Sequence, residues 1–339
     1  MTVKVGINGF GRIGRNFYRA ALESGADVDV VAVNDIAPLD VNAHLLAYDS
    51  TQGRLPAEVE VTGDGIRVGE RSFRVVSERD PKSLPWGELG VDVVVESTGR
   101  FTDGGEARAH IDAGARRVVI SAPAKNVDAT FVMGVNDQTF DPAAHTIVSN
   151  ASCTTNCFVP MVKVLDDAFG VGHGLMTTVH AYTNDQNLLD LTHKDLRRAR
   201  AAAINIVPSS TGAARATGLV LQAMQGRLDG VALRVPVAAG SITDFTAVVD
   251  AVVDAEAVNR AFAQAASTGP LSRVLVYSEA PIVSSDIIGS PASCTFDAPL
   301  TMAVGLGNGS TLVKVFGWYD NEWGYSNRLL DLTLAVGRP

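Results

Sequence analysis

Cysteine is scarce in this sequence, with Cys153, Cys157 and Cys294 as the three in 339 residues. An odd, low number does not build a disulfide framework, and it is typical of a reducing compartment. Basic residues are also in the minority, with 28 lysines and arginines against 37 acidic residues and a net charge of −9. This balance argues against nucleic acid or an anionic membrane as the main partner.

Long apolar runs are missing as well. No stretch approaches the roughly 20 residues that a membrane-spanning helix needs, and residues 1–6 lack the basic start and apolar core of a secretory signal. We therefore expect a cytoplasmic protein without membrane contact. There is no internal repeat and no low-complexity linker, and the length indicates two domains.

The first half of the chain contains short apolar runs separated by helical segments. Val3–Asn8, a glycine-rich turn and Arg12–Ser24 at helical spacing form the first strand–helix pair. Strands that alternate with helices predict an α/β domain with a parallel, doubly wound Rossmann-type sheet. The further runs expected as strands are 28–33, 91–95, 117–120, 130–135 and 146–148.

The pattern changes near residue 150. A helix is expected over Cys153–Phe169, and longer strand-like stretches with few helices between them follow. This predicts an α+β domain with a mostly antiparallel sheet that is open to water on one face. The strands expected there are 175–183, 231–237, 243–253, 274–276 and 312–318, and residues 325–336 should be helical.

The segment from Gly9 to Gly14 has the form G-x-G-x-x-G, which also occurs in turns that only connect a strand to a helix. Here a strand precedes it, a helix follows it, and Asp35 stands about 20 positions further on, at the end of the next strand. Gly9 permits a tight turn, Gly11 lets a pyrophosphate approach the backbone, and Gly14 lets helix and strand pack closely. The phosphates are expected at the positive end of the helix dipole.

Asp35 is expected to accept hydrogen bonds from the adenosine ribose hydroxyls and to repel the additional phosphate of NADP. Ile36 and Ala37 supply no positive charge beside it. A solvated aspartate at a strand end is the alternative. The segment therefore favours NAD as the cofactor.

Cys153 is the candidate nucleophile. Ser152 is a natural N-cap, so Cys153 falls in the first helical turn, where free N–H groups stabilise a thiolate and lower the cysteine pKa. Most intracellular cysteines behave as small buried hydrophobic residues. This interpretation suits Cys157 and Cys294. For Cys153 both a structural and a catalytic role are open. The best-placed base is His180, near the end of an apolar strand, where a purely structural histidine is the alternative.

Three segments could bind anions. Residues 194–200 are a basic cluster in an acidic chain, or a solvated or subunit-contacting loop. Residues 209–212 offer hydroxyls and a glycine N–H, as a phosphate cradle or an ordinary turn does. Arg234 interrupts an apolar strand, and a buried arginine needs an anionic partner, either a structural carboxylate or a substrate phosphate.

Together these segments resemble phosphorylating glyceraldehyde-3-phosphate dehydrogenase of the bacterial type, over essentially the whole chain. The run Ala151-Ser152-Cys153-Thr154-Thr155-Asn156 is highly specific. The other blocks that carry the resemblance, in the same order along the chain, are residues 5–15, 180–183, 209–214 and 318–326.

The resemblance implies that Cys153 attacks the aldehyde of glyceraldehyde 3-phosphate, that a hydride passes to NAD, and that inorganic phosphate cleaves the thioester to give 1,3-bisphosphoglycerate, in glycolysis or gluconeogenesis. His180 would activate the thiol, and no metal is implied. The resemblance assigns the attacking phosphate to Ser152, Thr154, Thr211 and Gly212, the substrate phosphate to Thr183 and Arg234, and the region between them to Arg198. It assigns the dinucleotide to Gly9, Gly11, Arg12, Ile13, Gly14, Asp35, Arg79, Ser121 and Asn321.

The resemblance also implies a homotetramer in which the loop 183–206 reaches the cofactor site of a neighbouring subunit. The expected domains are residues 1–151 for NAD binding, 152–318 for catalysis, and 319–339 as a C-terminal helix returning to the first domain. Leu191–Thr192 departs from the Leu-Pro of many NAD-specific relatives. Residues 237–241 depart from the usual continuation after Arg-Val-Pro, a change expected to affect packing near the active site or inhibitor sensitivity.

Three rival interpretations are open. Erythrose-4-phosphate dehydrogenase has the same nucleophile and cofactor but releases the acid with water, and the nearly complete phosphate-site set argues against it. A second, inhibitor-resistant copy of the enzyme is suggested only by residues 237–241. A non-enzymatic binding or scaffold protein is disfavoured because Cys153, His180 and Arg234 are all present.

Overall fold

The computed structural model describes residues 2–338, so Met1 and Pro339 of the predicted domains lie outside the described residues. The chain divides into two compact units. The first contains the chain up to Phe131, Asp137–Ala151 and the residues from Ser326 onward. The second contains Val132–Asn136 and Ser152–Tyr325.

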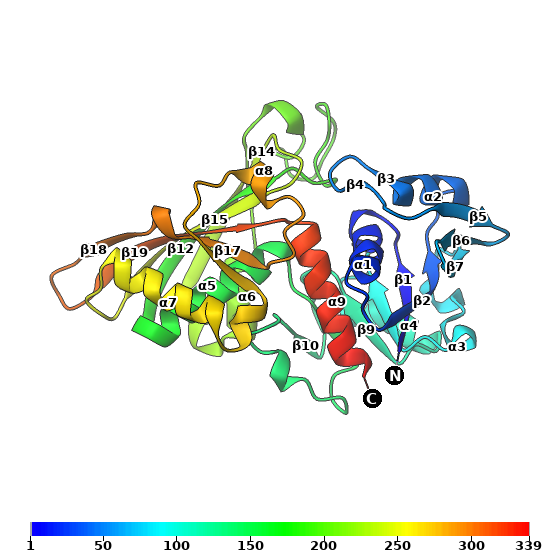
Figure 1. Cartoon of the computed structure of the whole chain (residues 1–339), viewed down its shortest axis with the longest axis horizontal. Helices are drawn as coiled ribbons and strands as arrows, with labels where there is room; N and C mark the ends of the chain where they lie inside the picture. Colours follow the sequence, from blue (N-terminus) through cyan, green and yellow to red (C-terminus); the bar gives the residue numbers. More distant parts are fainter. Residues whose placement is uncertain (1, 339) are drawn as a thin grey trace. The chain divides into compact units, whose positions relative to one another are not determined.

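The first unit is built on a nine-stranded sheet with the order β10-β11-β9-β8-β1-β2-β7-β6-β5 (Figure 1). The pairs from β10 to β7 are parallel, and β6 is antiparallel to both of its neighbours, β5 and β7. The strands are β1 (Val3–Asn8), β2 (Val28–Asn34), β5 (Val59–Thr62), β6 (Gly65–Val68), β7 (Arg71–Val76), β8 (Val93–Glu96), β9 (Arg117–Ile120), β10 (Ala129–Thr130) and β11 (Ile147–Ser149).

Helices connect these parallel strands. They are α1 (Arg12–Glu23), α2 (Leu39–Ala47), α3 (Trp86–Leu89) and α4 (Gly104–Asp112), and a small hairpin pairs β3 (Tyr48–Asp49) with β4 (Gly53–Arg54). The central strand β1 is buried along most of its length because helices cover both faces of a doubly wound sheet. Its apolar run therefore shows no period-two alternation.

The run 130–135 is not a strand, contrary to the prediction, because β10 ends at Thr130. Gly134 has φ +82°, which a strand does not allow. The Val135 N–H donates to the Val132 carbonyl at 3.1 Å and closes a turn. The apolar residues of this run are buried in the turn, so their hydrophobicity indicated burial and not an extended backbone.

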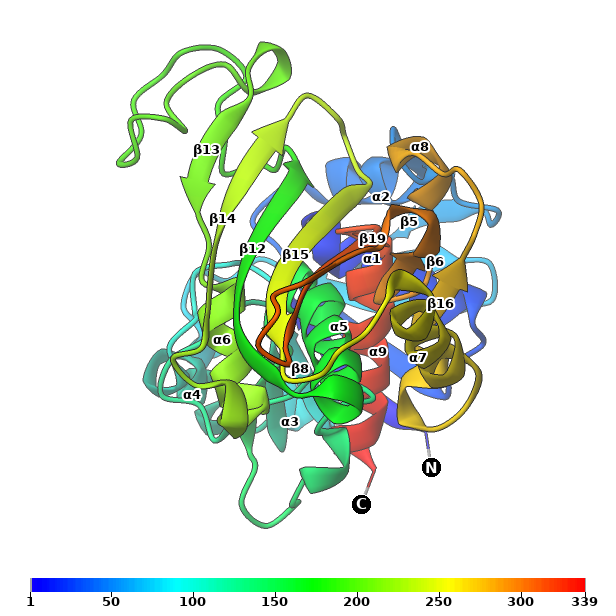
Figure 2. The ribbon, with the colours of Figure 1, turned by 90° about the vertical axis from the view of Figure 1, so that its left-hand side faces the viewer.

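The second unit contains an eight-stranded sheet with the order β13-β14-β12-β15-β19-β17-β16, and β18 pairs with β19 (Figure 2). Two strand pairs, β12 with β14 and β16 with β17, are parallel, and the others are antiparallel. The strands are β12 (Val171–Ala181), β13 (Val207–Ser210), β14 (Leu228–Val235), β15 (Ser241–Val249), β16 (Leu275–Ser278), β17 (Cys294–Asp297), β18 (Met302–Gly305) and β19 (Thr311–Tyr319).

Helices cover one face of this sheet. Helix α5 packs against β12, β15, β17 and β19, and the Phe158 and Phe245 rings meet edge to face at 4.8 Å. Along β15 and β19, buried residues alternate with partly exposed ones, as expected for a sheet covered on one side. The helices are α5 (Cys153–Phe169), α6 (Ala213–Val220), α7 (Ala255–Ser267) and α8 (Ser284–Ile287), and α9 (Trp323–Gly337) continues into the first unit.

The predicted fold class is confirmed: a mostly parallel Rossmann-type sheet is followed by a mostly antiparallel one. The start of β12 differs from the prediction because glycine dilutes the apolar pattern there. Strand β12 begins at Val171, ahead of the predicted Leu175, because Gly172 and Gly174 supply no apolar side chain but leave the backbone extended. Across residues 2–338, no helix combines the length and the hydropathy that crossing a bilayer requires.

Candidate functional site

The turn between β1 and α1 has the backbone that the glycine motif predicts. Gly9 has φ +93°, and a Cβ at this position would lie 2.7 Å from the Thr98 nitrogen. A Cβ on Gly14 would lie 2.3 Å from the Gly9 carbonyl oxygen, so helix and strand pack closely there. A Cβ on Gly11 would meet nothing within 4 Å. Two of the glycines therefore serve backbone shape and packing, and the third borders open space.

A cavity of about 240 Å³ lies beside this turn, and Gly9, Gly11, Asp35 and Arg79 line it. Helix α1 has Gly11 as its N-cap and no side-chain cap, and the N-terminus of a helix favours a bound anion. The Asp35 carboxylate accepts the N–H groups of Phe10 and Ala37, both at 2.8 Å, and keeps further lone pairs for ribose hydroxyls. These features fit a dinucleotide.

Four of the predicted cofactor residues of the first unit do not line this cavity: Arg12, Ile13, Gly14 and Ser121. Arg12 forms an ion pair with Asp49, and the Ser121 N–H donates to the Glu96 carbonyl at 2.9 Å. Conversely, residues that the sequence analysis did not name line the cavity. They stand at or after the carboxyl ends of β1, β2, β7 and β8, which is the position that could have indicated them: Asn8, Asn34, Glu78, Ser97 and Thr98.

The candidate nucleophile is at the start of α5. The Ser152 hydroxyl accepts the Thr155 N–H at 3.0 Å, as predicted for an N-cap, so Cys153 is the first helical residue. His180 lies at the end of β12, and its Nε2 is 3.4 Å from the Cys153 sulfur. Sequence reasoning left their meeting open, and the tertiary structure brings them within hydrogen-bond distance for sulfur.

The predicted lowering of the Cys153 pKa is not what the structure produces. Burial of the sulfur raises the pKa of the thiol, although Arg234 and the hydroxyl and N–H of Thr154 oppose this shift. The helix-start groups act in the predicted direction but are outweighed by burial. Burial, together with the charge of Arg234, also lowers the pKa of His180 to about 3. Cys153 and His180 therefore form a neutral thiol–imidazole pair.

The other ring nitrogen of His180 has one neighbour that is a hydrogen-bond acceptor and one that is a donor. His180 Nδ1 lies 2.7 Å from the Ala181 carbonyl oxygen, which needs a donor, and 2.7 Å from an Arg234 nitrogen, which is a donor. A proton on Nδ1 satisfies Ala181 and leaves a lone pair on Nε2 facing the thiol, the form of a general base. The contact with Arg234 favours the other tautomer.

Arg234 reaches His180 because β12 and β14 are parallel and place the two residues in register. The partners that the structure records for it are His180 and the Ala181 carbonyl, not the structural carboxylate that was one of the two alternatives. One guanidinium nitrogen, Nε, is buried without a partner. The side chain is therefore partly unsatisfied and contacts one member of the Cys153–His180 pair.

The remaining anion candidates also belong to the second unit. Thr183 and Arg198 both contact Asp185, which sequence reasoning missed although it stands in the same loop. The Thr211 hydroxyl accepts the Ala213 N–H at 3.2 Å, and Gly212 is the N-cap of α6 without a side-chain cap. These last two residues offer backbone donors at a helix start.

Two further residues were not assigned a role from the sequence. Ser241, in the segment 237–241, donates its hydroxyl to Asn321 Oδ1 at 3.0 Å and accepts the Ala181 N–H at 3.1 Å. Tyr319 contacts the Thr154 and Thr178 hydroxyls at 2.8 and 2.7 Å, and its ring packs edge-on against His180. Both residues occur in segments that the sequence analysis named. Their residue types alone do not predict which groups they contact. Within residues 2–338, no group of three or more His, Cys, Asp or Glu side chains is arranged to hold a metal.

Comparison with known proteins agrees with this geometry. Residues 3–104 match the family model of the glyceraldehyde 3-phosphate dehydrogenase NAD binding domain, and residues 152–321 match that of the C-terminal domain. The chain is 61% identical to glyceraldehyde-3-phosphate dehydrogenase 1 of Streptomyces avermitilis and 60% identical to glyceraldehyde-3-phosphate dehydrogenase of Streptomyces coelicolor, over 99% of both chains in each case. It is 58% identical to glyceraldehyde-3-phosphate dehydrogenase of Mycobacterium avium, over 100% of this chain and 99% of that one.

These matches confirm the predicted family, enzyme class and cofactor. The chain belongs to the glyceraldehyde 3-phosphate dehydrogenase family and is an NAD-dependent oxidoreductase.

Proposed function

We propose that the chain oxidises D-glyceraldehyde 3-phosphate to 1,3-bisphosphoglycerate with NAD and inorganic phosphate, through a thioester on Cys153, in glycolysis or gluconeogenesis. The observation that carries the proposal is the 3.4 Å approach of the Cys153 sulfur and His180 Nε2 at a helix start. Relatives that are 57–61% identical over nearly the whole chain bear the enzyme's name.

The proposed reaction begins with a proton transfer from Cys153 to His180. His180 accepts the thiol proton of Cys153, and the thiolate attacks the aldehyde carbon. His180 then returns the proton to the carbonyl oxygen, which gives a hemithioacetal and leaves His180 neutral again. NAD, when bound, supplies the hydride acceptor. His180 then takes the hydroxyl proton of the hemithioacetal as the C–H bond breaks, and a thioester remains on the sulfur. An inorganic phosphate oxygen attacks the thioester carbon, and Cys153 leaves as the thiolate.

Two anion positions are proposed around this pair. The substrate phosphate is assigned to Thr183 and Arg234, with Arg198 between the two positions. Binding of that phosphate would draw Arg234 away from His180 Nδ1, which supports the base tautomer because Nδ1 then has only the Ala181 carbonyl as partner. The attacking phosphate is assigned to Ser152, Thr154, Thr211 and Gly212.

The roles of the residues assigned to the dinucleotide are likewise proposed. Gly9 and Gly14 shape the turn, the open side of Gly11 admits the pyrophosphate, and Asp35 binds the ribose hydroxyls and disfavours NADP. The other assigned contacts are Arg12, Ile13, Arg79, Ser121 and Asn321. We propose residues 1–151 as the NAD-binding domain, 152–318 as the catalytic domain, 319–339 as the returning helix, and the cytoplasm as the location.

NADH formation with glyceraldehyde 3-phosphate, followed at varied phosphate concentration, tests the reaction. We expect turnover that rises with phosphate and saturates, because phosphate has to cleave the thioester. The comparison substrate is erythrose 4-phosphate. Faster oxidation of that aldehyde, with acid released in the absence of phosphate, would replace this proposal by the rival dehydrogenase.

Arg234→Leu tests the substrate phosphate. A charged hydrogen bond contributes roughly 1.5–3 kcal/mol, so the preference in kcat/KM for phosphorylated over unphosphorylated glyceraldehyde should fall by about 10- to 100-fold. Arg260→Leu is the matched control, because Arg260 is an exposed arginine of the same unit, paired with Glu256. An unchanged ratio in Arg234→Leu would exclude the phosphate contact.

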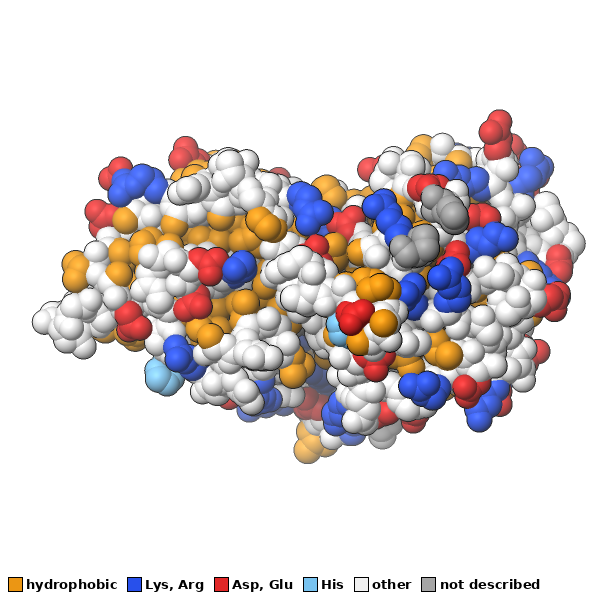
Figure 3. All heavy atoms as spheres, turned by 90° about the horizontal axis from the view of Figure 1, so that it is seen from below, with side chains coloured by type: hydrophobic (Ala, Val, Ile, Leu, Met, Phe, Trp, Pro, Cys, Tyr) orange, Lys and Arg blue, Asp and Glu red, His pale blue; other side chains and the backbone are white. Residues whose placement is uncertain are grey.

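We further propose a homotetramer. The loop 183–206 exposes large apolar side chains, including Leu188 (76%), Leu189 (74%) and Leu196 (82%), which is unusual unless another surface covers them. Seen from below, hydrophobic side chains also gather on the surface of the second unit (Figure 3). These exposed apolar side chains support the proposal that other copies of the chain cover them in an assembly.

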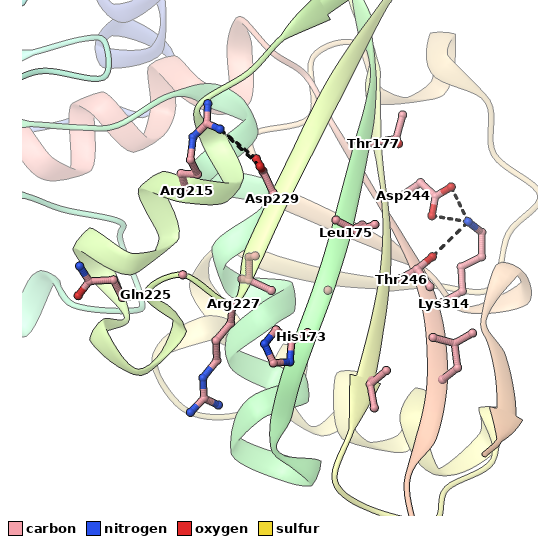
Figure 4. Close-up of a pocket in the computed structure, with 15 residues that line it drawn as sticks. His173, Leu175, Thr177, Arg215, Gln225, Arg227, Asp229, Asp244, Thr246 and Lys314 are labelled. Carbon is pink, nitrogen blue, oxygen red and sulfur yellow. Dashed lines mark hydrogen bonds and ion pairs between the residues drawn. The ribbon is translucent and has the colours of Figure 1, made fainter. Parts of the chain in front are cut away.

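The uncovered face of the second sheet carries a cavity of about 840 Å³. Leu175 is exposed there, Lys314 contacts both Asp244 oxygens at 2.6 Å, and Arg215 lies 3.3 Å from Asp229 (Figure 4). Apolar area with paired charges is typical of subunit interfaces. The mass in solution, measured by light scattering, tests the assembly, and a monomer would contradict it.

A further inference from the structure

A buried carboxylate stands behind the wall of the cavity at the glycine turn. Glu96 is the last residue of β8 and is 2% exposed, and two of its hydrogen-bond partners, Asn8 and Thr98, line the cavity. Asn8 Nδ2 donates to Glu96 Oε2 at 2.6 Å. The N–H and the hydroxyl of Thr98 donate to Glu96 Oε1 at 2.8 and 2.5 Å. No step of the proposed reaction uses this carboxylate.

His110 and Trp86 fix the pattern of protons on the other side of Glu96. The Trp86 indole N–H donates to His110 Nδ1 at 3.0 Å, and His110 Nε2 lies 2.9 Å from Glu96 Oε2. An indole nitrogen can only donate, so Nδ1 carries no proton and Nε2 carries the one that it donates to Glu96. Both Glu96 oxygens therefore face donors, a pattern that the ionised carboxylate satisfies.

The amides of Asn8 and Asn34 connect Glu96 to the backbone of the cavity wall. Asn34 Oδ1 accepts the Glu78 N–H at 2.8 Å, and Asn34 Nδ2 donates to the Glu78 carbonyl at 2.9 Å. These contacts fix the orientation of the Asn34 amide, whose Nδ2 also donates to Asn8 Oδ1 at 2.7 Å. Asn8 then has its Nδ2 toward Glu96, so an acceptor is required there. Glu78 and the next residue, Arg79, line the cavity.

We propose that Glu96 is a positioning residue of the dinucleotide site: its carboxylate fixes the orientation of the Asn8 and Asn34 amides and so holds the backbone at Glu78 in the cavity wall. If the Asn8 amide rotated, its NH₂ group would face that of Asn34. If Asn34 rotated in turn, it would lose both contacts with Glu78, and buried groups without partners are costly. The proposal rests on the assignment of this cavity to NAD.

The test measures the dissociation constant of NAD by titration calorimetry, without aldehyde. In Glu96→Gln, the new NH₂ group faces the Thr98 N–H in one orientation and Asn8 Nδ2 in the other. Either orientation disturbs a residue of the cavity wall, so the dissociation constant should rise by about tenfold. Loss of a negative charge would by itself strengthen the binding of an anionic dinucleotide, so the expected sign distinguishes orientation from charge.

Exchanging the amide and the carboxylate should restore binding. Asn8→Asp alone places two carboxylates against each other and should raise the dissociation constant by at least about tenfold. In the double variant Glu96→Gln/Asn8→Asp, the new glutamine donates to the new aspartate and still accepts from Thr98, and the aspartate accepts from Asn34. It also offers an acceptor to His110, whose Nε2 lies 3.4 Å from the Asn8 amide nitrogen. The double variant should bind NAD within about threefold of wild type.

Asp92→Asn is the matched control. Asp92 directly precedes β8, and its carboxylate accepts the Lys4 N–H of β1 at 2.9 Å, at the opposite end of the same strand pair. This variant should bind NAD as wild type does. Unchanged binding in Glu96→Gln, or losses that add in the double variant, overturn the proposal. If a single variant fails to fold, the double variant decides alone, and its failure to fold or to bind NAD also overturns the proposal.

Gly11→Leu distinguishes failure of the positioning role from failure of the site assignment. Gly11 has φ −72°, which leucine adopts without strain, and its side chain would enter open space at the cavity. NAD binding should weaken by at least about tenfold if the pyrophosphate lies there. Normal binding by Gly11→Leu would remove the assignment of the cavity and the proposal with it. Weaker binding by Gly11→Leu together with normal binding by Glu96→Gln would exclude the positioning role alone.

Discussion

Cys153→Ser should reduce dehydrogenase turnover by at least about 10⁴-fold, because a serine hydroxyl is a far weaker nucleophile and no thioester can form. NAD binding should be retained, since the cofactor cavity is lined by residues of the first unit. Turnover is measured by NADH absorbance, and NAD binding by titration calorimetry on the same preparation. Turnover close to wild type would remove Cys153 from the mechanism.

Cys157→Ala is the matched control for this variant. Cys157 is one helical turn from Cys153 and is also a thiol, but it is fully buried, with its sulfur 3.5 Å from the Gly317 carbonyl oxygen. Burial and the neighbouring Cys294 raise its pKa well above the ordinary value, so it is not a thiolate. We expect this variant to lose some stability through a small cavity and to keep its activity.

His180→Gln should lower kcat by about 10²- to 10⁴-fold, the usual contribution of a positioned general acid–base group. The amide preserves a polar side chain near Arg234 but cannot accept and return a proton. His173→Gln is the matched control, since His173 is an exposed histidine on the same strand. A His180→Gln enzyme as fast as the control would eliminate His180 as the proton carrier.

The same variant should change how acid affects stability. An unfolded histidine takes up a proton near pH 6.5, whereas folded His180 stays neutral down to about pH 3 because its pKa is lowered by burial and Arg234. The unfolded state binds more protons in this window, so the free energy of unfolding falls on acidification from about pH 6.5 toward 3, by up to about 1.4 kcal/mol per pH unit. Urea unfolding at pH 7 and at pH 5 should show a smaller loss in His180→Gln than in wild type. An equal loss would mean that His180 is protonated in the folded chain.

Local patterns in the sequence determined the elements and their classes. Ser152 before Cys153 specifies a helix start, and α5 occupies Cys153–Phe169 as predicted. The glycine motif specified a turn whose backbone Gly9 and Gly14 alone could provide, because added Cβ atoms would collide with backbone atoms. The pattern failed at 130–135, where hydrophobicity reflected a buried turn instead of a strand.

The contacts of the candidate site depend on strand order and register, which local patterns do not contain. Only the parallel pairing of β12 with β14 places Arg234 beside His180, and only the packed sheet brings Tyr319 to Thr154 across the chain. The direction of the Cys153 pKa shift depends on a balance between burial and nearby donors, and burial is a property of the folded chain. The sequence by itself therefore determined which residues are candidates for the chemistry, and the tertiary structure decided which of them meet and in what state of charge.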